Sequence, residues 1–395
     1  MWRKQTKMAN IAFIHEKFPF GGGEVVTMNV IQSLKKYGYR FVIFSPELKL
    51  DKLSAPLENV EYVTLQYRVE DARNLQKIIS EIEKYKIDIF ISQGFKIPYL
   101  NDIRTKTSAK VVFVSHNAPF WESVYKKENG KHSASKSIFK WLEWYLLRSI
   151  KFSLGLFDKK LRKTYLHIYN SVDAFGVLCD SYGYEFANTL KIDYSSSKFV
   201  TLTNAAYPDV DYKANKAKEI CFVGRLSYAD KRVDRLLKIW SLLENKYPDW
   251  ILNIVGDGAE LETLKRLSKE ISLKSVNFVG HTKTPKSYYD KAAIVCLTST
   301  SEGWPMTLIE AQANGCVAIA FDVCAGINEI LSPSWENGVL VKPFDIDEYA
   351  NALSRLMNDY DLRNRIAENG RQHVAEFSEE RTAQQWINMI NKLLQ

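Results

Sequence analysis

Short apolar segments alternate along the first half of the chain with longer segments that mix apolar and polar residues at helical spacing. The short segments are rich in Val, Ile and Phe, which is typical of strands covered on both faces of a sheet. They are residues 10–15, 40–45, 60–65, 87–92, 110–116, 173–179 and 199–204. Amphipathic segments such as 24–37 and 71–85 separate most of them. This alternation predicts βαβ units and a parallel sheet.

The same alternation starts again in the second half of the chain. Six further strands are predicted at 219–224, 250–256, 275–279, 292–297, 316–321 and 338–341. Helices are predicted between them at about 231–247, 259–272, 306–315 and 345–376. A last amphipathic segment, 379–395, belongs to neither series, and the polar stretch 204–218 between the two series reads as a linker.

The length of 395 residues agrees with two domains of ordinary size. We therefore expect two doubly wound, Rossmann-like α/β domains whose parallel sheets face a cleft. The predicted limits are 1–204 for the first domain, 205–378 for the second and 379–395 for a C-terminal helix.

Cysteine usage and hydropathy bear on the compartment. The five cysteines form no CxxC pair and lie in or beside apolar segments, so reduced core thiols fit better than disulfides or a zinc site. The apolar run at 11–14 is too short for a signal peptide, and no run approaches the roughly 20 residues of a membrane span. We expect a cytoplasmic protein, with peripheral contact at the inner face of the plasma membrane left open.

Nearly all the excess positive charge lies in residues 120–167. This segment has eleven Lys and Arg against four acids, in a chain of net charge +8, and it is also rich in Trp, Phe and Tyr. Cations mixed with aromatic residues suit an anionic membrane surface. Two other interpretations stay open: a helical hairpin whose aromatics pack on the first domain, or a nucleic-acid surface. No nucleic acid is expected as partner, because no recognised nucleic-acid module accompanies the segment.

Two loops carry the candidate chemistry. In "FVGRLSYADKRVDRLL" (222–237), Arg225 and Lys231 follow the end of a strand, where doubly wound sheets bind ligands. Two cations beside a helix N-terminus suit a diphosphate, although a solvated basic turn would look the same.

The second loop lies in "STSEGWPMTLIEAQANGCVAIA" (299–320). Pro305 is well placed to begin a helix, with Glu302 before it and Glu310 inside it. Carboxylates accept hydrogen bonds from vicinal hydroxyls, so sugars are natural partners. Taken singly, the two acids could equally be ordinary loop and helix-surface residues.

The spacing of Glu302 and Glu310 resembles the E-x7-E signature of the family 4 retaining glycosyltransferases. The segments "VGRLSYADKR", "IVGDGAELETLKRL" (254–267) and "FPFGGGEVVTMNVIQSL" (18–34) stand in the matching order. The likeness runs along almost the whole chain and is weakest over 120–170. It implies the GT-B fold, with the C-terminal helix crossing back onto the first domain.

The resemblance implies a role for each matching residue of the second domain. Arg225 and Lys231 would bind the donor diphosphate and stabilise it as it leaves. Glu310 would hold the ribose hydroxyls, and Glu302 the transferred sugar. The backbone after Glu302 would also contact the donor, through Gly303, Trp304, Pro305, Met306 and Thr307.

Three residues of the first domain match as well. Gly22 and Gly23, in the first strand-to-helix loop, would let the backbone approach the donor phosphate or the acceptor. His116, at the end of a strand, would face the transferred sugar as a catalytic residue, with a structural histidine as the alternative.

The chain departs from the family pattern at three places. Arg232 stands where glycine usually follows the phosphate-binding lysine, and Asn117 stands where Asp often follows the histidine. Asn204-Ala205 replaces the usual Asn-Gly near the hinge. The first departure would add a third phosphate contact, and the second leaves the hydrogen bonding of His116 open.

Metal is not expected to take part. The Asp-x-Asp triplets at 209–211, 345–347 and 359–361 lie away from the inferred phosphate site and read as loop or cap acids. Walker A, G-x-S-x-G and zinc-spaced histidines are absent from the sequence. No cofactor is expected beyond a nucleoside diphosphate sugar as co-substrate.

These features predict retaining transfer of a sugar from a UDP- or GDP-linked donor to a hydroxyl acceptor. The acceptor would be a lipid-linked or membrane-adjacent glycan, as in envelope or capsular polysaccharide synthesis. Two alternatives stay open: a sugar-nucleotide epimerase, or a noncatalytic nucleotide-sugar-binding protein on a membrane.

Overall fold

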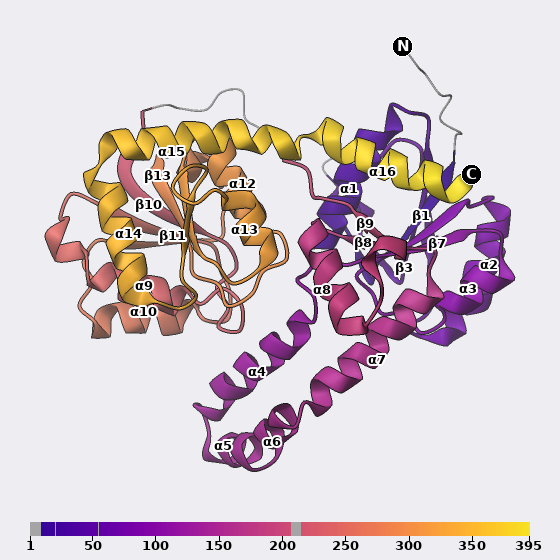
Figure 1. Ribbon diagram of the computed structural model, residues 1–395, viewed down its shortest axis with the longest axis horizontal. Coiled ribbons are helices and arrows are strands. Elements are labelled where there is room, and N and C mark those ends of the chain that lie inside the picture. Colours follow the sequence, from indigo (N-terminus) through magenta and orange to yellow (C-terminus); the bar gives the residue numbers. More distant parts are fainter. Residues whose placement is uncertain (1–8, 20, 54, 207–214) are drawn as a thin grey trace. The chain divides into compact units, whose positions relative to one another are not determined.

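The computed structural model describes residues 9–19, 21–53, 55–206 and 215–395 (Figure 1). Contacts divide the chain into two units. The first unit comprises Met1–Pro119, Lys159–Ala205 and Glu379–Gln395, and the second comprises Phe120–Asp158 and Ala206–Ser378. This grouping differs from the predicted domain limits mainly at 120–158, which the sequence assigned to the first domain. Residues 207–214 of the predicted linker, with its Asp-x-Asp triplet, lie outside the described residues.

The first unit contains a seven-stranded parallel sheet. In spatial order its strands are β5 (Val60–Thr64), β3 (Arg40–Ser45), β1 (Asn10–Ile14), β6 (Ile89–Gln93), β7 (Lys110–Val114), β8 (Ala174–Val177) and β9 (Phe199–Thr201). Each of the seven predicted strands is present. The chain order reverses between β1 and β6, which makes this the topological switch point where doubly wound sheets bind ligands. A short pair, β2 (Lys17–Phe18) and β4 (Glu47–Leu48), was not predicted.

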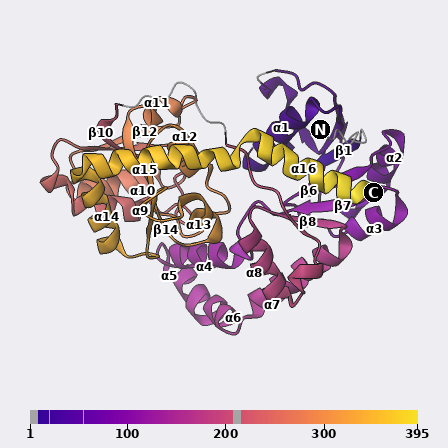
Figure 2. The same cartoon turned by 45° about the horizontal axis from the view of Figure 1, so that its top comes forward.

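Helices pack on this sheet because their apolar faces complete its core. They are α1 (Gly22–Lys35), α2 (Leu75–Lys84), α3 (Leu100–Lys106), α8 (Asp180–Leu190) and α16 (Glu379–Leu394). The C-terminal helix α16 packs beside α1, as Figures 1 and 2 both show. Its buried Trp386 meets the Phe13 ring edge-on at 6.2 Å, and Gln385 Oε1 accepts a hydrogen bond from the Thr203 backbone N–H. The C-terminal segment is therefore part of the first unit's core.

The second unit contains a six-stranded parallel sheet. Its order is β12 (Val276–Gly280), β11 (Ile251–Val255), β10 (Ala217–Val223), β13 (Ala292–Leu297), β14 (Val317–Phe321) and β15 (Val339–Val341). All six predicted strands are present, and the switch point lies between β10 and β13. The α/β architecture with two parallel sheets was predicted correctly.

The helices of this second sheet are mostly those predicted. They are α9 (Val233–Ser241), α10 (Leu261–Glu270), α11 (Lys286–Tyr289), α12 (Met306–Ala313), α13 (Ala325–Leu331), α14 (Ile346–Asn358) and α15 (Tyr360–His373). The single helix predicted over 345–376 is wrong, because Asp359 takes an extended conformation and ends α14. Its side chain accepts a hydrogen bond from the Leu362 backbone N–H and begins α15. Asp345 caps α14 in the same way, so the triplets at 345–347 and 359–361 begin with cap residues, as predicted.

A helical segment connects β7 to β8 of the first sheet (Figure 1). It consists of α4 (Trp121–Ala134), α5 (Ile138–Glu143), the π-helical turn η3 (Trp144–Arg148), α6 (Ser149–Ser153) and α7 (Leu156–Ser171). The boundary between the two units falls inside α7, between Asp158 and Lys159. In the described part of the chain, no helix is both long enough and apolar enough to span a membrane.

Candidate functional site

The candidate donor residues of the second unit lie at the switch point of its sheet. The loop 224–232 follows β10 and the loop 298–305 follows β13, and these two strands are neighbours at the point where the strand order reverses. Backbone contacts join the loops: the Thr300 N–H donates to Asp230 O at 2.7 Å, and Thr298 Oγ1 donates to Arg232 O at 3.0 Å. Parallel strands thus bring two segments 70 residues apart to one edge of the sheet, as predicted.

Lys231 and Glu302 are in direct contact. Lys231 Nζ donates to Glu302 Oε1 at 2.6 Å, and Ser299 Oγ donates to the same oxygen at 2.6 Å. The lysine side chain is 18% exposed and the glutamate side chain 9% exposed. The sequence assigned both residues to the donor site but gave no sign that they pair with each other.

Arg225 forms an ion pair with Asp230, an acid that the sequence did not indicate as part of the site. Arg225 Nη2 donates to Asp230 Oδ2 at 2.8 Å, while Ser227 Oγ donates to the other oxygen of Asp230. The Arg225 side chain is 69% exposed, so much of its surface is open to solvent beside this ion pair. Asp230 also accepts the Thr300 N–H, and it therefore fixes the shape of the loop that carries both cations.

Arg232 explains why glycine is usual at its position. Its φ of +49° lies in the left-handed region, which glycine adopts without strain. The side chain is held by Asp234 at 2.9 Å and by Glu128 of α4 at 3.4 Å, and it lies over the Tyr228 ring at 4.1 Å. The guanidinium is thus engaged inside the protein, unlike the third phosphate contact that the sequence suggested.

The GDG motif allows two loops to touch. Gly256 and Gly258 have φ of +139° and +159°. A Cβ at Gly256 would overlap the Gly224 carbonyl, and one at Gly258 would overlap the carbonyl of Leu226. Glycine is required at both positions for close backbone approach, so the motif lets its own loop pack against the loop 224–232.

Helix α12 begins at Met306, with Pro305 as the preceding cap residue and not as the first helical residue. No side chain of the described residues caps this end. Thr307 Oγ1 and Trp304 Nε1 are buried and have no hydrogen-bond partner within the described residues. Trp304 packs edge-on against Phe377 at 5.2 Å. Two buried polar groups are thus unpaired among the described residues at the start of α12, near the buried Gly303.

Glu310 lies in the middle of α12, where Tyr289 OH donates to its Oε2 at 2.7 Å. Burial raises the pKa of Glu310, and the hydrogen bond from Tyr289 opposes this rise. A half-buried carboxylate with one oxygen bound to a tyrosine keeps the other oxygen available to a hydroxyl ligand.

The first unit holds a polar chain at its own switch point. His116 Nε2 lies 2.5 Å from Gln93 Oε1, and Gln93 Nε2 donates to Thr27 Oγ1 at 3.1 Å. Thr27 Oγ1 lies 3.0 Å from His15 Nε2, and His15 Nδ1 lies 3.4 Å from Glu24 Oε1. This chain links the ends of β1, β6 and β7 with the first two turns of α1, and the sequence gave only its first member, His116.

The Gln93 side chain fixes proton positions in this chain. The Gln93 oxygen only accepts, so His116 Nε2 carries the proton, and the Thr27 oxygen accepts from Gln93 Nε2. Burial, with a smaller contribution from His15, lowers the pKa of His116 to about 4, so its ring is neutral at neutral pH. His116 Nδ1 has no hydrogen-bond partner among the described residues and is left as an acceptor.

Gly22 and Gly23 are the first two residues of α1, not members of the loop before it. A Cβ at either position would meet no atom within 4 Å. The cap residue Gly21 has a φ of +98°, and a Cβ there would lie 2.8 Å from Glu24 Oε2. The structure therefore requires glycine at Gly21, while open space lies beside the two glycines that the sequence selected.

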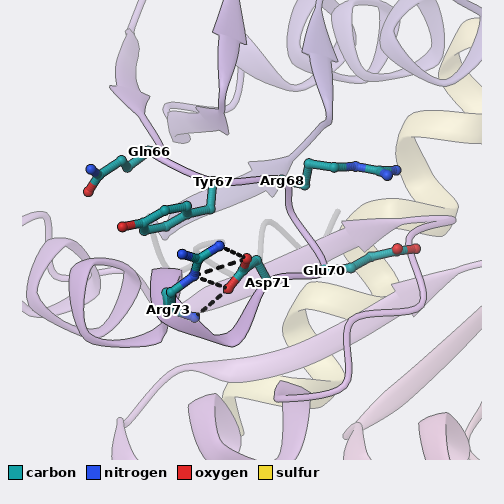
Figure 3. Close-up of a pocket in the computed structure, with 6 residues that line it drawn as sticks. All are labelled: Gln66, Tyr67, Arg68, Glu70, Asp71 and Arg73. Carbon is teal, nitrogen blue, oxygen red and sulfur yellow. Dashed lines mark hydrogen bonds and ion pairs between the residues drawn. The ribbon is translucent and has the colours of Figure 1, made fainter.

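A hollow of about 510 Å³ lies beyond β5 in the first unit (Figure 3). It is lined by Gln66, Tyr67, Arg68, Glu70, Asp71 and Arg73. Arg73 forms an ion pair with Asp71 and lies 3.7 Å from the centre of the Tyr67 ring. The ion pair with Arg73 lowers the pKa of Asp71 to about 2. None of the predicted site residues lines this hollow.

The described residues contain no cluster of His, Cys, Asp and Glu suited to a metal ion. All five cysteines are free thiols, and four of them are buried.

Two protein-family models match the chain, one in each half. Residues 206–373 match the model "Glycosyl transferases group 1", and residues 20–185 match the model "Glycosyltransferase Family 4". The chain belongs to glycosyltransferase family 4. The resemblance drawn from the sequence is confirmed.

Individual relatives match over part of the chain. An uncharacterized glycosyltransferase of Haemophilus influenzae is 37% identical over 44% of this chain and 49% of its own length. The amylovoran biosynthesis glycosyltransferase AmsD of Erwinia amylovora is 33% identical over 46% of this chain and 50% of its own. The chain thus spans about half the length, or less, of the first curated relatives it matches.

Solved structures match over almost the full length. The lipopolysaccharide outer core galactosyltransferase WaaB superposes with a TM-score of 0.70 at 21% identity, covering 97% of this chain and 99% of that one. HepE of Anabaena in complex with UDP has a TM-score of 0.74 at 15% identity, covering 98% and 100%. At this identity the likeness shows the fold, which is GT-B.

Proposed function

We propose that this family 4 protein is a retaining glycosyltransferase that moves a sugar from a nucleoside diphosphate donor to a hydroxyl acceptor. The observation that carries the proposal is the meeting of the two loops at the β10–β13 switch point, with Lys231 against Glu302. Cations for a diphosphate and carboxylates for hydroxyls lie at one sheet edge there. Retention of anomeric configuration rests on family membership.

In this reaction the bond between the anomeric carbon and the diphosphate breaks, and a bond from the acceptor oxygen forms. The acceptor hydroxyl gives up its proton to the departing diphosphate, on which negative charge grows. Arg225, Lys231 and the start of α12 would stabilise that charge without a metal ion. Glu310 would bind the ribose hydroxyls, and Glu302 the transferred sugar.

His116 would act as a neutral acceptor and not as an acid. Its lowered pKa and its proton on Nε2 leave Nδ1 to accept a sugar hydroxyl. Gln93, Thr27 and His15 would hold this tautomer in place.

The donor and acceptor are proposed by chemical class. HepE was solved with UDP, which supports a UDP-linked sugar, and GDP stays the alternative. AmsD takes part in amylovoran biosynthesis, which supports a role in envelope or capsular polysaccharide synthesis. The exposed cations of 120–158 favour a lipid-linked or membrane-adjacent acceptor at the inner face of the plasma membrane.

A panel of nucleotide sugars, followed by thermal shift and by release of free nucleoside diphosphate, tests this function. We expect one donor to raise the melting temperature and to release its diphosphate when an acceptor is added. Lys231→Ala should weaken UDP binding at least about tenfold, while Lys265→Ala, an exposed lysine of α10, should leave it unchanged.

Other outcomes would point elsewhere. Conversion of the donor sugar without release of diphosphate would mean an epimerase. Binding with no turnover on any acceptor would favour a noncatalytic binding protein. Unaltered UDP binding by Lys231→Ala would refute the site.

A further inference from the structure

An apolar surface lies exposed on the short helices between α4 and α7. Of the eighteen large apolar or aromatic side chains exposed in the described part of the chain, ten lie within residues 138–156. They are Ile138, Phe139, Trp141, Leu142, Tyr145, Leu146, Leu147, Ile150, Leu154 and Leu156. We call these ten residues the apolar edge. Such a concentration on a soluble surface marks an interaction site.

The apolar edge belongs to an ordered element. Trp144 is only 4% exposed and its ring lies against Gly130 of α4, where a Cβ would overlap it. Phe152 packs on Trp144 at 5.6 Å, and Phe157 packs on Phe152 at 5.3 Å. These three aromatics form a small core of the segment, while Phe139, Trp141 and Tyr145 are exposed. These contacts lie within the segment itself, whereas the packing alternative placed the aromatics on the first domain.

Cations accompany the apolar edge within the second unit. Seven Lys and Arg side chains of 120–158 are exposed: Lys126, Lys127, Lys131, Lys136, Lys140, Arg148 and Lys151. The same segment has four acids: Glu128 pairs with Lys131 and Arg232, and Glu143 pairs with Arg148. The surface is therefore apolar and positive together.

A hollow of about 470 Å³ opens where α4 ends and α5 begins. It is lined by Ala134, Ser135, Lys136, Ser137, Ile138 and Trp141. One side offers hydroxyls and the ammonium group of Lys136, which lies 3.4 Å from Glu260 Oε1, and the other offers two members of the apolar edge. This composition suits an anionic head group that is joined to an apolar chain.

We propose that the apolar edge inserts into an anionic lipid bilayer, with the neighbouring cations on the head groups. This inference rests on the proposed function only in that the acceptor is membrane-adjacent. A second copy of the chain is disfavoured as the occupant, because it would bring the same positive charge to the same surface. The helices α5, η3 and α6, which carry most of the apolar edge, are only five or six residues long, so the proposed contact is interfacial.

Insertion differs from purely electrostatic attachment in its response to salt. Salt screens the lysines but not the burial of apolar side chains. We therefore expect part of the binding to survive high salt, and that part should depend on the apolar edge.

Vesicle flotation of the full chain tests this inference. The probes are phosphatidylcholine vesicles with and without phosphatidylglycerol, at low and high salt, with no nucleotide present. The variant Phe139→Ser/Leu147→Ser removes side chains that are 80% and 60% exposed. The matched control Tyr360→Ser/Leu242→Ser changes side chains that are 58% and 55% exposed elsewhere in the second unit.

We expect the wild type and the control to float with anionic vesicles and to keep part of this binding in high salt. The apolar-edge variant should lose binding about tenfold or more and retain nothing in high salt. Its UDP binding and melting temperature should match the wild type, which separates this test from that of the transferase function.

Three results would overturn the inference. The first is no flotation of the wild type with either vesicle. The second is binding that salt removes completely and that the apolar-edge variant retains. The third is a lipid-free oligomer that Phe139→Ser/Leu147→Ser converts to monomer, which would assign the surface to a second copy.

Discussion

Arg232 combines a strained backbone with a well-satisfied side chain. A left-handed conformation costs a non-glycine residue roughly 1 kcal/mol. Against this stand ion pairs to Asp234 and Glu128 and a stacking contact on Tyr228. Removing the arginine leaves the partly buried Asp234 without this ion pair, and such a loss costs about 1–3 kcal/mol. Glu128 keeps its ion pair with Lys131 at 3.0 Å.

We predict that Arg232→Gly lowers the free energy of unfolding by about 1–2 kcal/mol, because the lost contacts outweigh the relieved strain. UDP affinity should change less than about threefold, since Arg232 binds protein groups and not the donor. Urea unfolding and calorimetry measure the two quantities. A stabilised variant, or one that loses UDP binding as Lys231→Ala does, would contradict this assignment.

His116 allows a pH prediction. Its pKa is lowered from 6.5 to about 4, so the folded protein keeps the ring neutral while the unfolded chain takes up a proton below pH 6.5. The stability that this neutral form contributes is present above pH 6.5 and is lost as the pH falls toward 4.

His116→Gln keeps a donor for Gln93 Oε1 but does not titrate. We expect the wild type to lose more stability than this variant between about pH 7 and about pH 5, as measured by urea unfolding at both values. An equal loss in the two proteins would show that His116 titrates normally in the folded state.

At this scale the sequence proposed candidate site residues but not the residues that they contact. Arg225, Lys231 and Glu302 were found because they follow predicted strands, and the sheet does bring Lys231 and Glu302 together. Asp230, Tyr289 and Gln93 were missed, because an acid, a tyrosine or a glutamine carries no local sign of a partner that is distant in sequence. The positive φ of Gly21 was also missed, because the backbone conformation of one residue does not change the hydrophobic pattern of the sequence.

Among the elements, α4 shows how a glycine can serve packing. Gly130 lies inside the helix, where alanine would ordinarily be more favourable by about 1 kcal/mol. Here a Cβ would overlap the buried Trp144 ring. Replacing Gly130 with alanine should therefore destabilise the protein instead of stabilising it.

We predict that Gly130→Ala displaces Trp144 and destabilises 120–158 by about 1–3 kcal/mol. Faster hydrogen exchange of the α4 amides is the measurement. Gly23→Ala in α1 is the control, because a Cβ there meets no atom within 4 Å and should leave exchange unchanged or slower. Unaltered exchange in Gly130→Ala would mean that Trp144 does not pack as described.

Strand positions were predictable because Val-, Ile- and Phe-rich runs are long and regular. The break at Asp359 was not, since a single cap residue interrupts a pattern that is otherwise helical on both sides. The sequence also did not show which aromatic residues of 120–167 are buried and which are exposed. Trp141, Trp144 and Tyr145 are close in sequence, and only the π-helical turn decides which of them faces inward.

For the whole molecule, two series of alternating strands and helices were enough to predict two parallel sheets. The family motifs then fixed the GT-B fold. Donor identity, acceptor identity and membrane contact depend on a few side chains each and cannot be predicted from such repeats.

A crystal structure of the protein with a bound UDP-sugar tests the donor site most directly. We predict that the diphosphate contacts Arg225, Lys231 and the start of α12, with the ribose on Glu310 and the sugar near Glu302. A nucleotide bound elsewhere, with the Lys231–Glu302 pair untouched, would contradict the donor site.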